Sequence, residues 1–127
     1  MSEAVKSYRE LKVWQKAMEL VPMVYQLARA FPSEERYALS DQIRRAVVSM
    51  PANIAEGQAR QSTKEFLHYL SIAQGSLAEL ETLLEVAVRL GYAKALEQQS
   101  LVSELESLRR MLYKLMQSLR QRLTTDH

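Results

Sequence analysis

A row of polar side chains at helical spacing is the part of this sequence that offers the most chemistry. The row lies within residues 39–57 and consists of Gln42, Arg45, Ser49, Asn53 and Glu56. Steps of three and four residues place side chains on one face of a helix. Amide, guanidinium, hydroxyl and carboxylate groups in one row can form a continuous hydrogen-bonded network.

The segment that follows contains groups that match this row. If two antiparallel helices turn near residue 61, Arg45 faces Ser76 and Glu79, while Asn53 faces Tyr69. We expect a partly buried network that fixes the register of the two helices. Its predicted members are Gln42, Arg45, Ser49, Asn53, Glu56, Ser76 and Glu79. The alternative interpretation is that the row faces a ligand or a partner.

Residues for catalysis or metal binding are sparse. Glu65 and His68 form the Glu-x-x-His spacing of di-iron bundles, but the only other histidine is His127 near the chain end. Glu65 also fits a capping box that begins at Ser62. There is no cysteine, and Ser49 and Ser76 have no histidine with a neighbouring carboxylate to activate them. We therefore expect a protein that is not an enzyme and has no cofactor and no metal.

Basic residues concentrate near the end of the chain, although the net charge is only +2. From residue 107 to residue 125 there are cations and no acid. Such a stripe can bind phosphates in a salt-sensitive way without reading sequence. The candidate nucleic-acid-binding residues are Arg44, Arg109, Arg110, Lys114, Arg120 and Arg122. The alternative is a solvated helix face whose cations favour the helix C-terminus.

Four amphipathic segments must position these groups. The apolar periodicity predicts helices over about 8–30, 34–59, 63–90 and 94–123, joined by short turns. This pattern predicts an all-α, antiparallel up-down-up-down four-helix bundle that forms one domain over residues 1–127. For the first helix, the expected inner face consists of Leu11, Trp14, Met18, Val21, Tyr25 and Ala28.

The ends and interruptions of the helices follow from a few residues. Ser7, Ser33 and Ser62 are expected N-caps, and Gly91 is an expected left-handed C-cap. Pro22 is expected to kink its helix without breaking it, and Pro51 either kinks or ends the second helix.

Two inner faces are long heptad seams, and further apolar residues lie outside them. The expected seams are Phe66, Leu70, Ala73, Leu77, Leu80, Leu84 and Ala87, then Leu101, Leu105, Leu108, Leu112, Leu115 and Leu119. The surplus residues are Leu67, Ile72, Leu83, Val88, Val102, Met111 and Met116. This surplus favours a homo-oligomer, and a tightly packed monomer is the alternative.

No signal peptide or membrane span is expected, and a cysteine-free chain fits the cytoplasm.

Several of these blocks together resemble a known family. They are Leu11–Ala17, Phe31–Pro32 with Glu35, Leu39–Arg45, Ser49–Gly57 and Gly75–Leu80. They look like the bacterial four-helix bundle proteins encoded by intervening sequences in 23S rRNA genes. These proteins are similar to the accessory protein of diversity-generating retroelements. The resemblance implies a homopentameric ring that associates with RNA, DNA or a ribonucleoprotein, and a protein partner such as a reverse transcriptase. A protein-interaction scaffold without nucleic-acid binding is the alternative.

Overall fold

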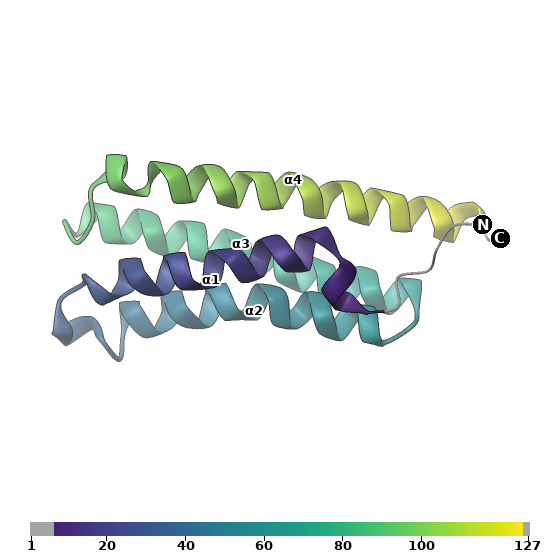
Figure 1. Ribbon diagram of the computed structural model, residues 1–127, viewed down its shortest axis with the longest axis horizontal. Helices are drawn as coiled ribbons and strands as arrows, with labels where there is room; N and C mark the ends of the chain where they lie inside the picture. The colour runs from purple at the N-terminus through teal and green to yellow at the C-terminus, as the bar shows by residue number, and fades with distance from the viewer. Residues whose placement is uncertain (1–6, 126–127) are drawn as a thin grey trace.

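The chain forms a bundle of long helices that run back and forth along one axis (Figure 1). The computed structural model describes residues 7–125. Its elements are η1 (Tyr8–Glu10), α1 (Lys12–Arg29), η2 (Ser33–Glu35), α2 (Leu39–Ala59), α3 (Thr63–Arg89) and α4 (Ala95–Thr125). Each α-helix contacts the next, and α1 also contacts α4, so α2 and α4 lie diagonally opposite. The predicted all-α four-helix bundle is confirmed.

The core contains the apolar seams predicted for α3 and α4, together with an apolar seam on α2. The first residue of the α3 seam, Phe66, is only partly buried. Ile43, Met50 and Ile54 of α2 are fully buried, and so are Leu70 and Leu80 of α3. One position differs near the end of α4. There Met116 is buried while Leu115 is only partly buried. A straight α-helix drifts by about 20° per heptad, so the buried seam takes a second step of four residues at Met116.

The inner face predicted for α1 is confirmed at Leu11 and Ala28, but the four predicted residues between them are wrong by one position. The buried residues of α1 are Val13, Ala17, Leu20, Val24 and Ala28. Met18 is 43% exposed, and Trp14, Val21 and Tyr25 pack against the edge of the core. Neighbouring residues point about 100° apart on a helix, so α1 has two adjacent apolar rows. The row of small and branched residues lies inside, because it allows close packing, and the bulky aromatic row lies on the flank.

Both internal prolines lie within continuous helices. Pro22 lies inside α1, and Pro51 lies inside α2, where it is buried. The apolar seam of α2 continues to Ile54, beyond the proline. The prediction that Pro22 does not break its helix is confirmed, and of the two outcomes left open for Pro51 the structure excludes a stop.

The helix starts differ from the prediction at two places. Ser7 caps only the short helix η1, with its hydroxyl accepting from the Arg9 amide at 3.1 Å. Ser33 does not cap α2, because Ser33–Glu35 is a separate 3-10 turn and α2 begins at Leu39. Instead, the Glu35 carboxylate accepts from the Leu39 amide at 3.3 Å, where the positive end of the helix dipole favours an anion.

The two predicted caps on α3 are confirmed. The Ser62 hydroxyl accepts from the Glu65 amide at 3.3 Å. At the other end Gly91 has a φ of 79°, the left-handed conformation that favours glycine. The Gly91 amide bonds to the Val88 carbonyl, and the Tyr92 amide bonds to the Ala87 carbonyl. These two bonds define a Schellman motif, which ends α3 and turns the chain toward α4.

Candidate nucleic-acid interface

The centre of the polar row joins α2 to α3, as predicted. The Ser49 and Ser76 hydroxyls are 2.8 Å apart, and Ser76 is only 8% exposed. Asn53 donates through Nδ2 to the Ser49 carbonyl at 2.8 Å and to the Ser49 hydroxyl at 3.0 Å. These three residues form a small interhelical network, which fixes the register of α2 against α3.

The expected contacts of Arg45 are not formed. Its side chain is 80% exposed, and Nε donates to the Asp41 carboxylate of the same helix at 3.1 Å. Gln42 and Glu79 are also exposed, and their side chains have no hydrogen-bond partner among the described residues. A guanidinium with a carboxylate four residues away can stay hydrated, which avoids the cost of burying a charge. Arg45, Gln42 and Glu79 therefore lie outside the network.

The expected contact between Asn53 and Tyr69 is also wrong. Tyr69 lies instead against Gly57, where a Cβ atom would come within 2.6 Å of the Tyr69 Cβ. The Tyr69 hydroxyl donates to Glu56 at 3.4 Å and accepts from Arg60 at 2.7 Å. Because glycine at position 57 lets the two backbones approach, Tyr69 reaches the last turn of α2 rather than Asn53.

Arg60 joins Glu56 and Tyr69 in a second cluster, which the sequence interpretation did not predict. Its guanidinium donates to Glu56 at 2.9 Å and lies over the Tyr69 ring at 5.1 Å. The hydrogen bond to Glu56, followed by the charge interaction with Tyr69, raises the pKa of Arg60 above its ordinary value. The spacing of four residues between Glu56 and Arg60 was the signal that could have revealed this pair.

The six basic candidates do not lie on one surface. Arg44 belongs to α2, and its Nη2 donates to the Arg36 carbonyl at 3.0 Å. Because α2 and α4 lie diagonally opposite, Arg44 is on a different side of the bundle from the candidates on α4. Arg109 pairs with Glu81 of α3, so its charge is already compensated. Four candidates on α4 remain, Arg110, Lys114, Arg120 and Arg122.

Three of these four cations lie on the solvent-exposed side of α4, with Arg120 toward α3. Arg110, Lys114 and Arg120 are exposed and have no carboxylate partner among the described residues. At about 100° per residue they span roughly 120° of the helix surface. By the same geometry, Arg122 lies on the side of α4 that faces α1. We call Arg110, Lys114, Arg120 and the aromatic residue between them, Tyr113, the basic face.

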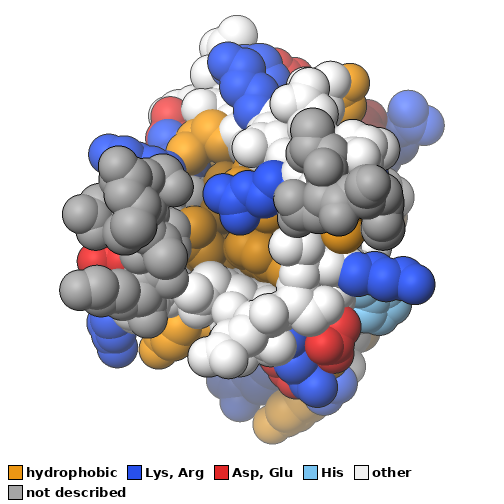
Figure 2. All heavy atoms as spheres, turned by 90° about the vertical axis from the view of Figure 1, so that its right-hand side faces the viewer, with side chains coloured by type: hydrophobic (Ala, Val, Ile, Leu, Met, Phe, Trp, Pro, Cys, Tyr) orange, Lys and Arg blue, Asp and Glu red, His pale blue; other side chains and the backbone are white. Residues whose placement is uncertain are grey.

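Tyr113 was not singled out from the sequence, although an aromatic residue among cations was a usable signal. It is 53% exposed, which leaves much of its ring accessible to solvent. An aromatic ring beside cations can stack on a nucleic-acid base while the cations contact phosphates. The end of the bundle where α4 finishes has Lys and Arg side chains on several sides, with hydrophobic atoms between them (Figure 2).

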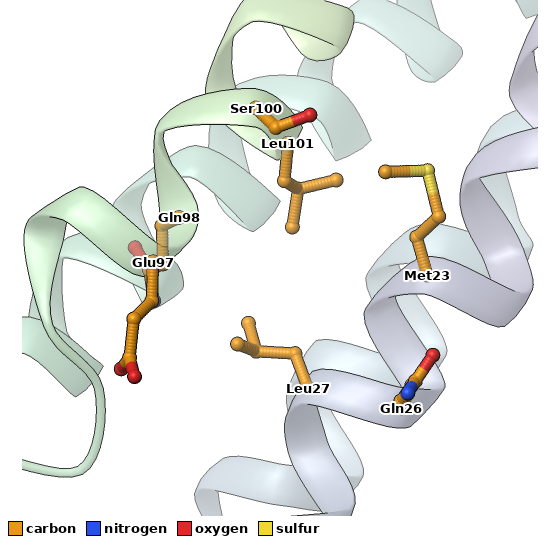
Figure 3. A pocket seen from close by; sticks show the side chains of 7 residues that line it. All are labelled: Met23, Gln26, Leu27, Glu97, Gln98, Ser100 and Leu101. Carbon is orange, nitrogen blue, oxygen red and sulfur yellow. The ribbon is translucent and has the colours of Figure 1, made fainter.

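A shallow pocket of about 250 Å³ lies between α1 and α4 near the other end (Figure 3). Met23 and Leu27 of α1 and Leu101 of α4 form its apolar walls. Gln98 is buried, with only 4% of its surface exposed, and its Nε2 atom has no hydrogen-bond partner among the described protein atoms. Glu97 and Ser100 also line the pocket, and the Glu97 carboxylate accepts from the Lys94 amide at 3.1 Å.

The remaining motifs have local structural roles. Within the described residues no cluster of three or more potential metal ligands occurs. His68 lies beside the Tyr69 ring at 5.5 Å. The Glu65 amide donates to the Ser62 cap, while the Glu65 carboxylate lies 3.9 Å from the Arg60 guanidinium instead of closing the capping box. His127 lies outside the described residues. A search for membrane-spanning helices over the described part of the chain finds none.

Comparison with known proteins places the chain in a family. The family model for 23S rRNA-intervening sequence protein matches residues 9–114. A solved structure of a protein of unknown function from the S23 ribosomal protein family of Bacteroides thetaiotaomicron VPI-5482 is similar, with 26% identity and a TM-score of 0.76. The match covers 83% of this chain and 95% of that one. A search of curated proteins found no match. This chain therefore belongs to the 23S rRNA-intervening sequence protein family.

Proposed function

We propose that this protein is a non-enzymatic, homo-oligomeric bundle that associates with nucleic acid through the basic face of α4. The observation that supports the proposal is the grouping of three exposed cations without carboxylate partners around an exposed tyrosine. Cations in such an arrangement bind phosphates and release counterions, which gives affinity without sequence specificity. The family name, which refers to 23S rRNA, is consistent with an RNA partner.

The proposed interface contains fewer residues than the six basic candidates that the sequence suggested. Arg110, Lys114 and Arg120 contact phosphates, and Tyr113 stacks on a base. Arg109 is engaged by Glu81, and Arg44 lies on the opposite side of the bundle. The resemblance to retroelement accessory proteins adds a homopentameric state, a cytoplasmic location and a reverse transcriptase partner to the proposal. These three features are expectations from resemblance.

Replacing the three cations tests the proposal directly. The variant Arg110→Gln/Lys114→Gln/Arg120→Gln is titrated against labelled structured RNA and duplex DNA at low salt, with binding followed by fluorescence anisotropy. Loss of about three phosphate contacts is expected to weaken binding at least tenfold. A matched control, Arg29→Gln/Arg36→Gln/Lys94→Gln, removes the same charge at the opposite end of the bundle. Equal affinity of the test variant and the unmodified protein, or an equal loss in the control, would refute the assignment.

The alternative function is a protein-interaction scaffold, and the same titration separates the two. A scaffold without nucleic-acid affinity shows no anisotropy change with either RNA or DNA at low salt. That result would discard the nucleic-acid part of the proposal and leave the homo-oligomer part standing.

A further inference from the structure

Gly75 lies in the middle of α3, and no contact within the described chain explains why this position is a glycine. Glycine in a helix interior costs about 0.5–1 kcal/mol relative to alanine. Gly57 has a packing reason, because Tyr69 leaves no room for a side chain there. A Cβ atom at Gly75 would meet no other atom within 4 Å. The missing side chain therefore leaves a gap on the outer surface of α3, which we call the notch at Gly75.

Residues one turn away from Gly75 are exposed and do not pair within the described chain. Ile72 is 38% exposed, although it is a large aliphatic side chain. Glu79 is exposed, and no described residue pairs with its carboxylate. Steps of three and four residues place Ile72, Gly75 and Glu79 in one row, which we call the α3 outer stripe.

A second row, on α2, has the complementary order of features. Val48 is 42% exposed, and Ala52, one turn later, is also exposed. Arg44, one turn earlier, has no carboxylate partner among the described residues and uses one guanidinium nitrogen to bind the Arg36 carbonyl. We call Arg44, Val48 and Ala52 the α2 outer stripe. From Arg44 to Ala52 this stripe presents a cation, a branched side chain and a small residue. Read in the opposite direction, from Glu79 to Ile72, the α3 outer stripe presents an anion, a notch and a branched side chain.

We infer that the α2 outer stripe of one copy packs antiparallel on the α3 outer stripe of a second copy. In this register Arg44 faces Glu79, Val48 enters the notch at Gly75, and Ile72 packs on Ala52. Side chains that enter gaps on a facing helix are the usual packing of paired helices. The opposite charges favour this register and disfavour alternatives that place like charges together.

The axial position of the two stripes supports this register. Ser49 and Ser76 lie at the same height, because their hydroxyls are 2.8 Å apart across the antiparallel pair. Counting from them at 1.5 Å per residue, Arg44 and Glu79 differ in height by only about 3 Å. Copies related by rotation about an axis parallel to the helices keep the same height. The contact therefore needs almost no shift along the bundle, as closure into a ring requires.

The inference rests on the homo-oligomer part of the proposed function and names the surface that forms it. The two stripes lie on neighbouring helices and differ from one another, so each copy uses both in a heterologous contact. The basic face lies on α4, outside both stripes, and stays accessible in the assembly.

A charge exchange tests the contact. The mass of the protein is measured by light scattering over a concentration series for Arg44→Glu, Glu79→Arg and the double variant. Each single variant places like charges together and is expected to raise the concentration for half-assembly at least tenfold. The double variant restores opposite charges and is expected to return to within about threefold of the unmodified protein. Glu106→Arg, an exposed position on α4, is the matched control and assembles normally.

Gly75→Leu provides a second test that does not depend on charge. The Cβ atom of the added side chain meets nothing within 4 Å in the folded chain, so folding is expected to be retained, while the leucine fills the notch and is expected to block assembly. Circular dichroism confirms the fold of every variant. Normal assembly of folded Gly75→Leu, or of both single charge variants, overturns the inference while the homo-oligomer stands. An unmodified protein that is monomeric at micromolar concentration overturns both.

Discussion

Gly57 and Gly75 show how one residue type has two different physical roles in this bundle. Gly57 allows α2 and α3 to approach, since Tyr69 occupies the space of a Cβ atom. We predict that Gly57→Ala destabilises the fold by about 1–2 kcal/mol, because overpacking outweighs the gain in helix propensity. Denaturant unfolding measures this change.

The matched control is Gly75→Ala, measured in the Arg44→Glu background so that assembly does not contribute. Here a methyl group meets no neighbour, and stability is expected to rise by about 0.5–1 kcal/mol. Equal effects of the two glycine substitutions would contradict the close approach at Gly57.

Gln98 is the buried polar residue whose amide nitrogen lacks a protein partner. An unpaired buried polar group costs about 1–3 kcal/mol, and an apolar side chain of similar shape avoids this cost. We predict that Gln98→Met stabilises the protein by about 1 kcal/mol, measured as a shift of the unfolding midpoint. Gln99→Met changes an exposed neighbour and should leave the midpoint within error. A loss of stability in Gln98→Met would show that the amide is hydrogen-bonded in solution.

The polar contacts could be predicted from the sequence only where the positions of the two backbones allowed a side chain a single partner. Ser49 and Ser76 are small and face each other across a close helix pair, so their hydrogen bond followed from register alone. Arg45 and Tyr69 have long side chains that can reach several partners. Their actual partners depend on solvent exposure and on the space at Gly57, which a sequence does not give directly.

At the scale of elements, Tyr92 joins the two loops at one end of the bundle. Its hydroxyl donates to the Glu35 carboxylate at 2.6 Å, and its ring packs on Phe31. The hydrogen bond to Glu35, followed by desolvation, raises the pKa of Tyr92 above its ordinary value of about 10. The connection after α3 is thereby held against the connection between α1 and α2.

This contact predicts a pH-dependent difference between two proteins. Because the folded pKa is raised, the stabilising contribution is complete below the unfolded pKa of about 10 and is lost as pH rises through the folded value. Tyr92→Phe is expected to be less stable than the unmodified protein at pH 8, and the gap should narrow above pH 10. Urea unfolding at both pH values measures the gap. A gap that stays constant with pH would argue against the hydrogen bond.

The helices themselves were largely predictable, because long apolar seams leave little doubt about which face is buried. The seam of α3 differs only at Phe66, which is partly buried, and that of α4 changed only at Met116. The interior of α1 was mispredicted because two adjacent apolar rows compete, and periodicity alone does not weigh Ala17 against Met18. Packing against two neighbouring helices decides such a choice.

At the scale of the whole molecule, the square arrangement of helices separates the surfaces of the protein. The α2 and α3 outer stripes lie on neighbouring helices, while the basic face lies on α4. Charge alone suggested one basic stripe that included Arg44 and Arg109. The fold divides these residues, because Arg109 reaches Glu81 on α3 and Arg44 lies on the diagonal helix.

The dependence of nucleic-acid binding on salt tests the central claim most directly. The dissociation constant of the unmodified protein for structured RNA and duplex DNA is measured from low to moderate salt. Contacts from Arg110, Lys114 and Arg120 predict that the logarithm of the association constant falls with the logarithm of salt concentration, with a slope of about −2 to −3 per copy engaged. Absence of binding at the lowest salt, or binding that does not change with salt, would contradict the account.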